Sequence, residues 1–517
     1  MADNIAHESL LLHSYKRSFN GIAARLTEEE AQKLAGCLMN STLIYFSTCI
    51  NINSDHCMTR KIYAGMDGVV SVFPSETKKL QTTSKIIGAR YYRSLPYPKN
   101  SSDILSPRDT EGHGTHCAST AAGNLVSKAS LVGDSKRRGA ISTHCGVQEG
   151  CLDADILAAF DDAIADGVDI LSVSLGGLKP LDYFRNSIDI GAFHALRKGI
   201  FTSASAGNEG SNLKTITNFA PWSLAVAAST IDRHFDTKVQ LGNHKIYEVM
   251  PNRHVRLKIG GGNPTTTIWK STEGRDALAP YLPSFSLRGP NPNTPNILKP
   301  NIASPGVSIL AAWPPIPPVS GVEDDDRVAS YNIILGTSMA CPHAAGMAAY
   351  VKLFHPNWSP AAILSAFSTI AEFAYGAGLI NPSRAPYLGL VYDATKIDYI
   401  NFLCAHGYST KLLKALTGDS CSLSQSSHGT LSGHLNYPSV ALSTSNPKSV
   451  NGIFNRTVTN VGSPKSTYKA KVNAPPGLEI KVNPSVLKFT SLWQELQFQV
   501  MMKGLIEKTI VSGSLGT

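Results

Sequence analysis

Three short segments, far apart in the chain, carry residue types that are used in nucleophilic catalysis. GHGTH contains His113 between two glycines, SAGNEG contains Asn208, and GTSMACPHAAG contains Ser338. A histidine can take the proton of a serine hydroxyl and so turn that hydroxyl into a nucleophile. An asparagine amide can donate a hydrogen bond to the oxyanion that forms when the nucleophile attacks. This combination predicts acyl transfer with Ser338 as the nucleophile.

Ser338 is predicted to lie at the start of a helix. Gly336 allows a tight turn before it, and Pro342 fits the first turn of a helix that runs on through AAGMAAYVKLF. Free backbone N–H groups at such a helix end, together with the helix dipole, favour a developing negative charge. Asn208 ends the predicted strand IFTSASAGN and would supply a second donor from its side chain.

Each of these residues has a simpler explanation when it is taken alone. Ser338 could cap a helix, and Asn208 in Asn-Glu-Gly could form a turn. His113 and His116, three residues apart, could be metal ligands on a helix. No third ligand at a supporting spacing and no HExxH motif accompany them, so no metal and no cofactor are expected. Only the combination of the three segments points to catalysis.

Composition excludes several classes of protein. The 517 residues suggest two to four domains, and 42% hydrophobic with 16% charged residues is typical of a globular protein. The net charge of +9 is read as spread along the chain, without basic runs or interleaved aromatics, so no nucleic-acid partner is expected. No segment is long enough to span a membrane, and no signal peptide is visible at the amino terminus. The nine cysteines are an odd number and lack zinc-site spacing, so they leave the compartment open.

The middle of the chain, roughly residues 86–400, has the pattern of a parallel α/β sheet. In DADILAAFDDAIADGVDILSVSLGG, apolar residues recur at helical spacing and are followed by the alternating run VDILSVSL, which predicts a strand. Asp153 or Asp155 can cap this helix, and Gly167 can end it. A second helix in DIGAFHALRKG and the strand IFTSASAGN follow.

The two ends of the chain have a different pattern. The first 85 residues predict a small α+β unit, with a capping box of Thr27 and Glu30 and a strand in GVVSVFP, interrupted by an insertion at residues 37–64. From residue 435, short alternating runs such as IFNRTVTNV, TYKAKV and ELQFQV are separated by Pro, Gly and Asn turns. That spacing is typical of an all-β sandwich.

Together these segments resemble the subtilisin-like serine proteases, and most closely the plant cucumisin-type subtilases. SPRDTEGHGTHCASTAAGN is similar to the histidine motif of that family, TSASAGNEG to the segment of the oxyanion asparagine, and GTSMACPHAAG to the nucleophile motif. All three occur in the family's order. The resemblance implies that His113 is the general base, Ser338 the nucleophile and Asn208 the oxyanion donor.

The resemblance also implies a domain organisation. A subtilisin-like parallel sheet with helices on both faces would occupy residues 86–400, with a degenerate remnant of a protease-associated domain at 235–280. Residues 1–85, with HSYKRSFNGIAARLTEEEAQKLAG, resemble an inhibitory α+β propeptide. After a linker at 401–434, residues 435–517 resemble an all-β fibronectin type III-like sandwich, which is expected to be truncated.

The segment SLGG resembles the edge whose backbone pairs with the peptide substrate and lines the primary specificity pocket. The substrate-binding residues are then Ser174, Leu175, Gly176 and Gly177. The implied partners are polypeptide substrates and the chain's own propeptide as an intramolecular inhibitor. Members of the family are typically secreted and glycosylated, and four sequons allow glycosylation: Asn40, Asn100, Asn357 and Asn455.

The sequence departs from the family at the third catalytic residue, an aspartate that ends the first core strand upstream of the histidine motif. The acidic residues between Val69 and His113 are Glu76, Asp103, Asp109 and Glu111. None of them follows an apolar strand, and DSKRRGAISTHCGVQE replaces a second expected strand. We therefore predict a serine endopeptidase of impaired activity. The alternative is a catalytically inactive homologue, or a mis-spliced product, that at most binds peptides.

Overall fold

The computed structural model describes residues 11–15, 21–24, 43–46, 89–92, 106–123, 152–249, 266–269, 271–320, 327–367, 376–421, 435–444, 449–507 and 510–516. The capping box at Thr27, the strand GVVSVFP and the segment DSKRRGAISTHCGVQE lie outside these residues. Near the amino terminus, β1 (Leu11–Tyr15) pairs antiparallel with β2 (Gly21–Ala24), and β2 pairs parallel with β3 (Leu43–Phe46). β3 therefore lies inside the predicted insertion, 37–64.

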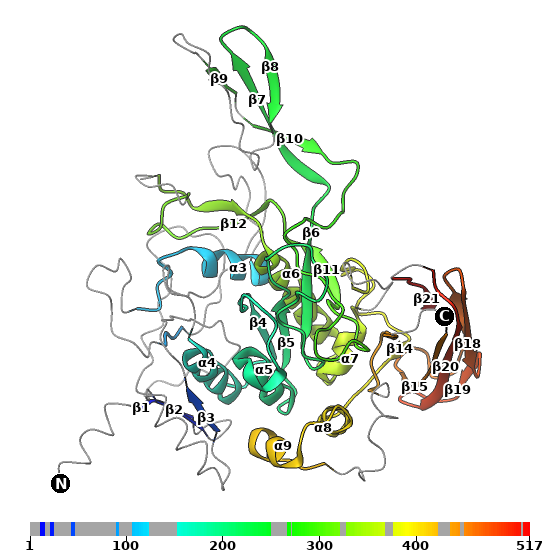
Figure 1. The fold of residues 1–517 in the computed structure, drawn as a ribbon. Coiled ribbons are helices and arrows are strands. Elements are labelled where there is room, and N and C mark those ends of the chain that lie inside the picture. Colours follow the sequence, from blue (N-terminus) through cyan, green and yellow to red (C-terminus); the bar gives the residue numbers. More distant parts are fainter. Residues whose placement is uncertain are drawn as a thin grey trace, which may run out of the picture.

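The centre of the molecule is a parallel sheet with the strand order β11–β6–β5–β4 (Figure 1). All its neighbouring pairs are parallel. Its strands are β4 (Ile170–Val173), β5 (Phe201–Ser205), β6 (Leu224–Ser229) and β11 (Ile302–Pro305). β5 and β6 are buried along their whole length, as expected for central strands of a parallel sheet.

Helices cover both faces of this sheet. Leu171 of β4 packs with apolar residues of α4 (Asp153–Ala165) and α5 (Ser187–Leu196). Its neighbour Ser172 lies 3.7 Å from the sulfur of Cys341 in α6 (Thr337–Phe354). Because successive side chains of a strand point to opposite faces, α4 and α5 lie on one face and α6 on the other. The predicted fold class is confirmed.

The structure confirms the predicted end of α4 but not its predicted caps. The helix begins after Leu152, and neither Asp153 nor Asp155 caps it. Asp153 instead accepts a hydrogen bond of 2.6 Å from the hydroxyl of Ser187, so its carboxylate joins α4 to α5. Gly167 follows the helix with a φ of 71°, a left-handed conformation that favours glycine, and it ends the helix as predicted.

A small antiparallel sheet projects from the carboxyl end of β6 (Figure 1). It consists of β7 (Arg233–Leu241), β8 (Ile246–Val249), β9 (Thr266–Ile268) and β10 (Thr272–Arg275). All four strands lie wholly or largely within residues 235–280. The interpretation of that segment as a remnant of a protease-associated domain stays a prediction.

The carboxy-terminal third contains helices followed by a β-sandwich. The helices are α7 (Pro360–Ser365), α8 (Lys396–Ala405) and α9 (Thr410–Thr417). Leu403 and Leu413 are fully buried in the main core, and a disulfide joins Cys404 to Cys421. The described part of segment 401–434 therefore packs on the main domain, which differs from the expected linker.

The sandwich confirms the all-β pattern of the carboxy-terminal region. One sheet has the order β14–β15–β20–β18, and two further pairs are β16–β19 and β17–β21. The strands are β14 (Leu390–Val391), β15 (Val450–Asn460), β16 (Ser466–Lys469), β17 (Lys471–Asn473), β18 (Leu478–Asn483), β19 (Val486–Phe489), β20 (Glu495–Gly504) and β21 (Ser514–Gly516). Phe454, Phe489 and Val500 form its core. No helix in the described part of the chain has the length and apolarity needed to cross a membrane.

Candidate active site

Ser338 is the second residue of α6, the helix that packs across the central sheet. Gly336 precedes the helix with a φ of 156° and a ψ of 162°, a region open to glycine. A Cβ at this position would lie 3.3 Å from Nδ2 of Asn208, so the glycine also lets the two segments approach closely. Glycine is therefore required before the serine by backbone conformation and by closeness to Asn208; the predicted tight turn itself stays a prediction.

Pro342 lies inside α6 and not in its first turn, because the helix begins at Thr337. The prediction of its position was therefore wrong. A proline has no N–H, so Pro342 cannot donate the helical hydrogen bond to the carbonyl of Ser338. That carbonyl oxygen instead accepts bonds from Ser174 Oγ at 2.7 Å and Cys117 Sγ at 3.3 Å. Pro342 thus leaves the carbonyl oxygen of Ser338 free to accept hydrogen bonds from β4's end and from α3.

The predicted substrate segment lies beside Ser338. The hydroxyl of Ser338 donates to the carbonyl oxygen of Ser174 at 3.3 Å, so the two serines exchange a pair of hydrogen bonds. Leu175 comes next, and its carbonyl oxygen accepts bonds from Asn218 Nδ2 at 2.6 Å and Ser205 Oγ at 3.2 Å. The buried Asn218 was not found from the sequence, although Asn218 helps to hold this edge in place.

The two glycines of SLGG are exposed directly after these bonds. A Cβ on Gly176 would lie 3.0 Å from Oγ1 of Thr217, whereas a Cβ on Gly177 would make only an ordinary contact at 3.6 Å. The segment from Ser174 to Gly177 is therefore anchored at its first two residues and open at its last two. Its role in binding substrate stays a prediction.

His113 is the first residue of α3 (His113–Ala122), which packs against α6. Gly112, before it, has a φ of 93°, and a Cβ there would lie 2.4 Å from the ring of Trp313. Asp109 accepts the backbone N–H of Gly112 at 2.7 Å and that of Thr115 at 2.6 Å. This carboxylate therefore organises the start of the helix that carries His113, in agreement with its place in the histidine motif.

Cys117 contacts both His113 and Ser338. Its sulfur lies 3.9 Å from each ring nitrogen of His113 and 3.3 Å from the carbonyl oxygen of Ser338. Burial raises the pKa of this thiol, which is therefore a neutral donor. Cys117 was missed in the sequence, although a residue four positions after His113 must lie on the same helix face.

The side chain of Asn208 is held against the start of α6 by its amide oxygen. Its Oδ1 accepts bonds from the backbone N–H and the hydroxyl of Thr337, both at 2.8 Å. Thr337 Oγ1 in turn accepts the N–H of Gly207 at 3.1 Å. These donors fix the orientation of the amide and leave Nδ2 beside Gly336. Asn208 is exposed, so an incoming carbonyl can reach it.

His116 plays a different part from His113. It is fully buried, and its Nε2 donates to the carbonyl oxygen of Ile309 at 2.9 Å, in β12 (Ile309–Ala312), which pairs with β13 (Tyr331–Ile334). Within the described ranges, no three His, Cys, Asp or Glu side chains form a group that could hold a metal ion. His116 thus joins α3 to β12.

Burial lowers the pKa of His116 to about 3, which predicts acid instability. The unfolded chain takes up a proton below about pH 6.5, whereas the folded chain takes it up only near pH 3. Stability should therefore fall by about 1.4 kcal/mol per pH unit from pH 6.5 towards 3. Urea unfolding between pH 7 and 4 measures this slope. In His116→Gln, which keeps a donor but does not titrate, the slope should be shallower; an equal slope would contradict the prediction.

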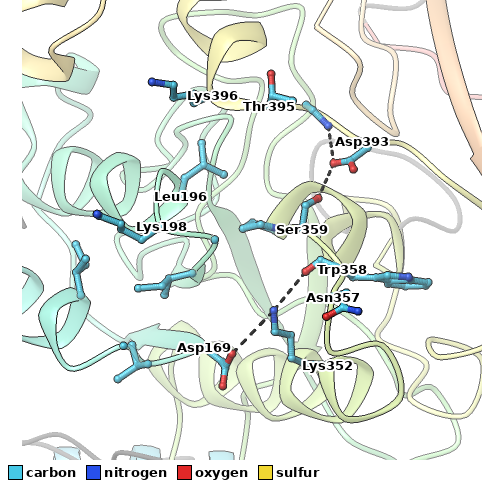
Figure 2. Close-up of a pocket in the computed structure, with 17 residues that line it drawn as sticks. Asp169, Leu196, Lys198, Lys352, Asn357, Trp358, Ser359, Asp393, Thr395 and Lys396 are labelled. Carbon is cyan, nitrogen blue, oxygen red and sulfur yellow. Dashed lines mark hydrogen bonds and ion pairs between the residues drawn. The ribbon is translucent and has the colours of Figure 1, made fainter. Parts of the chain in front are cut away.

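A cavity of about 600 Å³ lies elsewhere (Figure 2). Asp169 and Ile200 line it and directly precede β4 and β5, so it sits at the amino ends of the strands. Lys352 donates to the carbonyl oxygen of Trp358 at 3.3 Å and lies 3.9 Å from Asp169. Ligands of open α/β sheets bind at the carboxyl ends of the strands, where Ser174 and Asn208 lie. The cavity is therefore separate from the candidate active site.

Comparisons with known proteins give the same domain order as the sequence. The Subtilase family model matches residues 55–381, the Fibronectin type-III domain model residues 434–516, and the Peptidase inhibitor I9 model residues 2–36. Subtilisin-like protease SBT4.14 of Arabidopsis thaliana is 39% identical over 84% of this chain and 73% of its own length. Subtilisin-like protease SBT4.8 of the same plant is 36% identical over 96% of this chain and 86% of its own length.

Proposed function

Because the chain belongs to the subtilase family of serine endopeptidases, with an inhibitor I9 domain and a fibronectin type-III domain, we propose that it cleaves peptide bonds through an acyl-enzyme on Ser338. His113 takes the serine proton, and Asn208 with the backbone N–H of Ser338 holds the oxyanion. The observation that best supports this proposal is the pair of bonds from Thr337 to Asn208, because they hold the Asn208 side chain against the start of the helix that carries Ser338.

The proposed reaction has two stages. The Ser338 oxygen attacks the scissile carbonyl carbon while His113 accepts the hydroxyl proton, and the tetrahedral oxyanion forms between the two donors. Collapse breaks the C–N bond, and His113 gives the proton to the leaving amine. Water then hydrolyses the ester with His113 again as base. The substrate backbone pairs along Ser174–Gly177. The inhibitor domain blocks the same edge before maturation. The protein acts outside the cell.

The proposed enzyme is slow, because none of the acidic residues between Val69 and His113 follows an apolar strand in the sequence. Such a carboxylate fixes the tautomer of the histidine and stabilises the imidazolium that forms. In a subtilisin, its removal lowers turnover roughly 10⁴-fold. The rival proposal, an inactive homologue that only binds peptides, follows from the same gap.

A fluorophosphonate probe tests the proposal, since it reacts with an activated serine without needing full turnover. The full chain should become labelled, and labelling should disappear in Ser338→Ala but persist in Ser463→Ala, which changes an exposed serine of the sandwich. Circular dichroism checks that all three proteins are folded. If the folded wild-type protein is not labelled, the chain is the inactive homologue.

A further inference from the structure

The net charge is not spread evenly along the chain, contrary to the expectation from the whole sequence. Residues 434–516 contain nine Lys and Arg but only three Asp and Glu, so this segment carries +6 of the total +9. Arg456 is buried and hydrogen-bonded to backbone carbonyls of the same region, so it belongs to the interior. The remaining cations that the structure describes are exposed lysines.

Several of these lysines project from one face of the sandwich. Exposure alternates from Thr467 to Asn473 through β16 and β17, so Lys469 and Lys471 point the same way. The ladder continues between the two strands, where Ala470 N donates to the carbonyl oxygen of Ser485 at 2.8 Å. Lys488 of β19 lies opposite Thr467, on the same face. With the exposed Lys465 just before β16, we call this set the lysine face: Lys465, Lys469, Lys471 and Lys488.

The lysine face carries no compensating charge. β16, β17, β19 and β21 contain no Asp or Glu. Among the residues that the structure describes, none of the four lysines forms an ion pair. The other sheet differs, because Lys481 of β18 pairs with Glu479 at 2.7 Å, and Glu479 lies opposite Lys503 of β20. The positive field is therefore concentrated on the lysine face.

The geometry of this face fits an extended polymer of negative charges. Lysines two apart on a strand are separated by about 7 Å, and neighbouring strands by about 4.8 Å. All the cations are Lys, which offers a compact point charge; recognition of phosphate more often uses the planar fork of Arg. β16, β17 and β19 expose no aromatic side chain on which a nucleic-acid base could stack.

From these observations we propose that the lysine face binds an acidic polysaccharide, a polymer with a carboxylate on its sugar rings. The strands of the sandwich, red in Figure 1, lie on the other side of the molecule from α3. The surface is thus remote from the candidate active site, and binding there leaves that site open. It would hold the protein on a carboxylated matrix whether or not the chain is catalytically active.

The test uses the full chain with polygalacturonate as the probe and neutral dextran as the uncharged reference. Lys469→Gln/Lys488→Gln should bind polygalacturonate at least tenfold more weakly than wild type at low salt, with a shallower dependence on NaCl concentration. The matched control is Lys481→Gln/Lys503→Gln, on the other sheet, and it should weaken binding less than twofold. All these side chains are exposed, so thermal unfolding should show that each variant is folded.

Three results would overturn the proposal. Wild-type protein that binds polygalacturonate no better than dextran has no such site. Equal weakening in the two sets of variants would mean that only total charge matters. Binding to single-stranded DNA or phosphatidylserine vesicles tenfold tighter than to polygalacturonate would assign the lysine face to another class of partner.

Discussion

Replacement of Asn208 by leucine is expected to lower kcat about 10²–10³-fold, with a much smaller change in KM. In the proposed mechanism the amide nitrogen of Asn208 donates to the oxyanion, which forms only after attack, so its loss affects the chemical step. The rate of fluorophosphonate labelling reports the same donor, since the probe also develops a negatively charged oxygen. A labelling rate equal to that of wild type would remove Asn208 from the oxyanion site.

Asn208→Asp gives the sharper comparison. Its carboxylate keeps acceptors for both donors of Thr337, which bind Oδ1 at 2.8 Å each, so the local structure should persist. The variant nevertheless replaces the donor by a negative charge that repels the oxyanion, and its rate should fall at least as far as that of the leucine variant. Thr337→Val, which removes only the hydroxyl that orients the amide, should cost less than either.

The sequence was informative about residue types and their order, and less so about how they are held. The assignment of Ser338 to a helix start is correct because Gly336 and the small residues after it are local signals. The misplacement of Pro342 has a tertiary cause. The first turn of α6 is fixed by the bonds between Thr337 and Asn208, which is far away in the chain. Asn208 does not end its strand as predicted, because β5 stops at Ser205 and Asn208 lies in the loop that follows.

Other residues of the site were beyond sequence reasoning for a related reason. Cys117 and Asn218 are ordinary residues in the sequence, and their importance comes from contacts with Ser338 and Leu175 on other elements. The two candidate caps of α4 are the opposite case, in which a local signal is present but the structure does not use it. Asp153 had a plausible local role, but the hydroxyl of Ser187 from another helix takes its carboxylate. Local sequence patterns therefore predict helices and strands. The hydrogen-bond partners of polar side chains depend on how those helices and strands pack.

The second large effect concerns Lys299, which is fully buried where the main domain meets the sandwich region. Its ammonium donates to the carbonyl oxygens of Ala220 and Ser223, both at 2.7 Å, and to Oδ1 of Asn301 at 2.8 Å. Asn301 Nδ2 in turn donates to the hydroxyl of Tyr437 at 2.5 Å, within the region matched as fibronectin type-III. One buried cation thus supports contacts of both regions.

Lys299→Met is expected to destabilise the protein by about 3–5 kcal/mol, because it removes a buried charge and the three hydrogen bonds that its ammonium donates. Methionine nearly fills the volume, so the loss reports the polar contacts and not a cavity. Urea unfolding at constant pH measures it as a lower midpoint with an unchanged slope. Lys245→Met, on an exposed lysine, is the matched control and should stay within about 0.5 kcal/mol of wild type.

A double variant separates the charge of Lys299 from its hydrogen bonds. Asp189 is also fully buried, and its pKa is raised by burial and lowered by the nearby charge of Lys299. In Lys299→Met this carboxyl loses its counter-charge, so it must take up a proton or remain buried and uncompensated. Asp189→Asn should therefore recover part of the loss when it is combined with Lys299→Met, while it destabilises the wild-type protein. Additive effects in this cycle would mean that the two groups do not interact, and that the hydrogen bonds to Ala220, Ser223 and Asn301 keep Lys299 in the core.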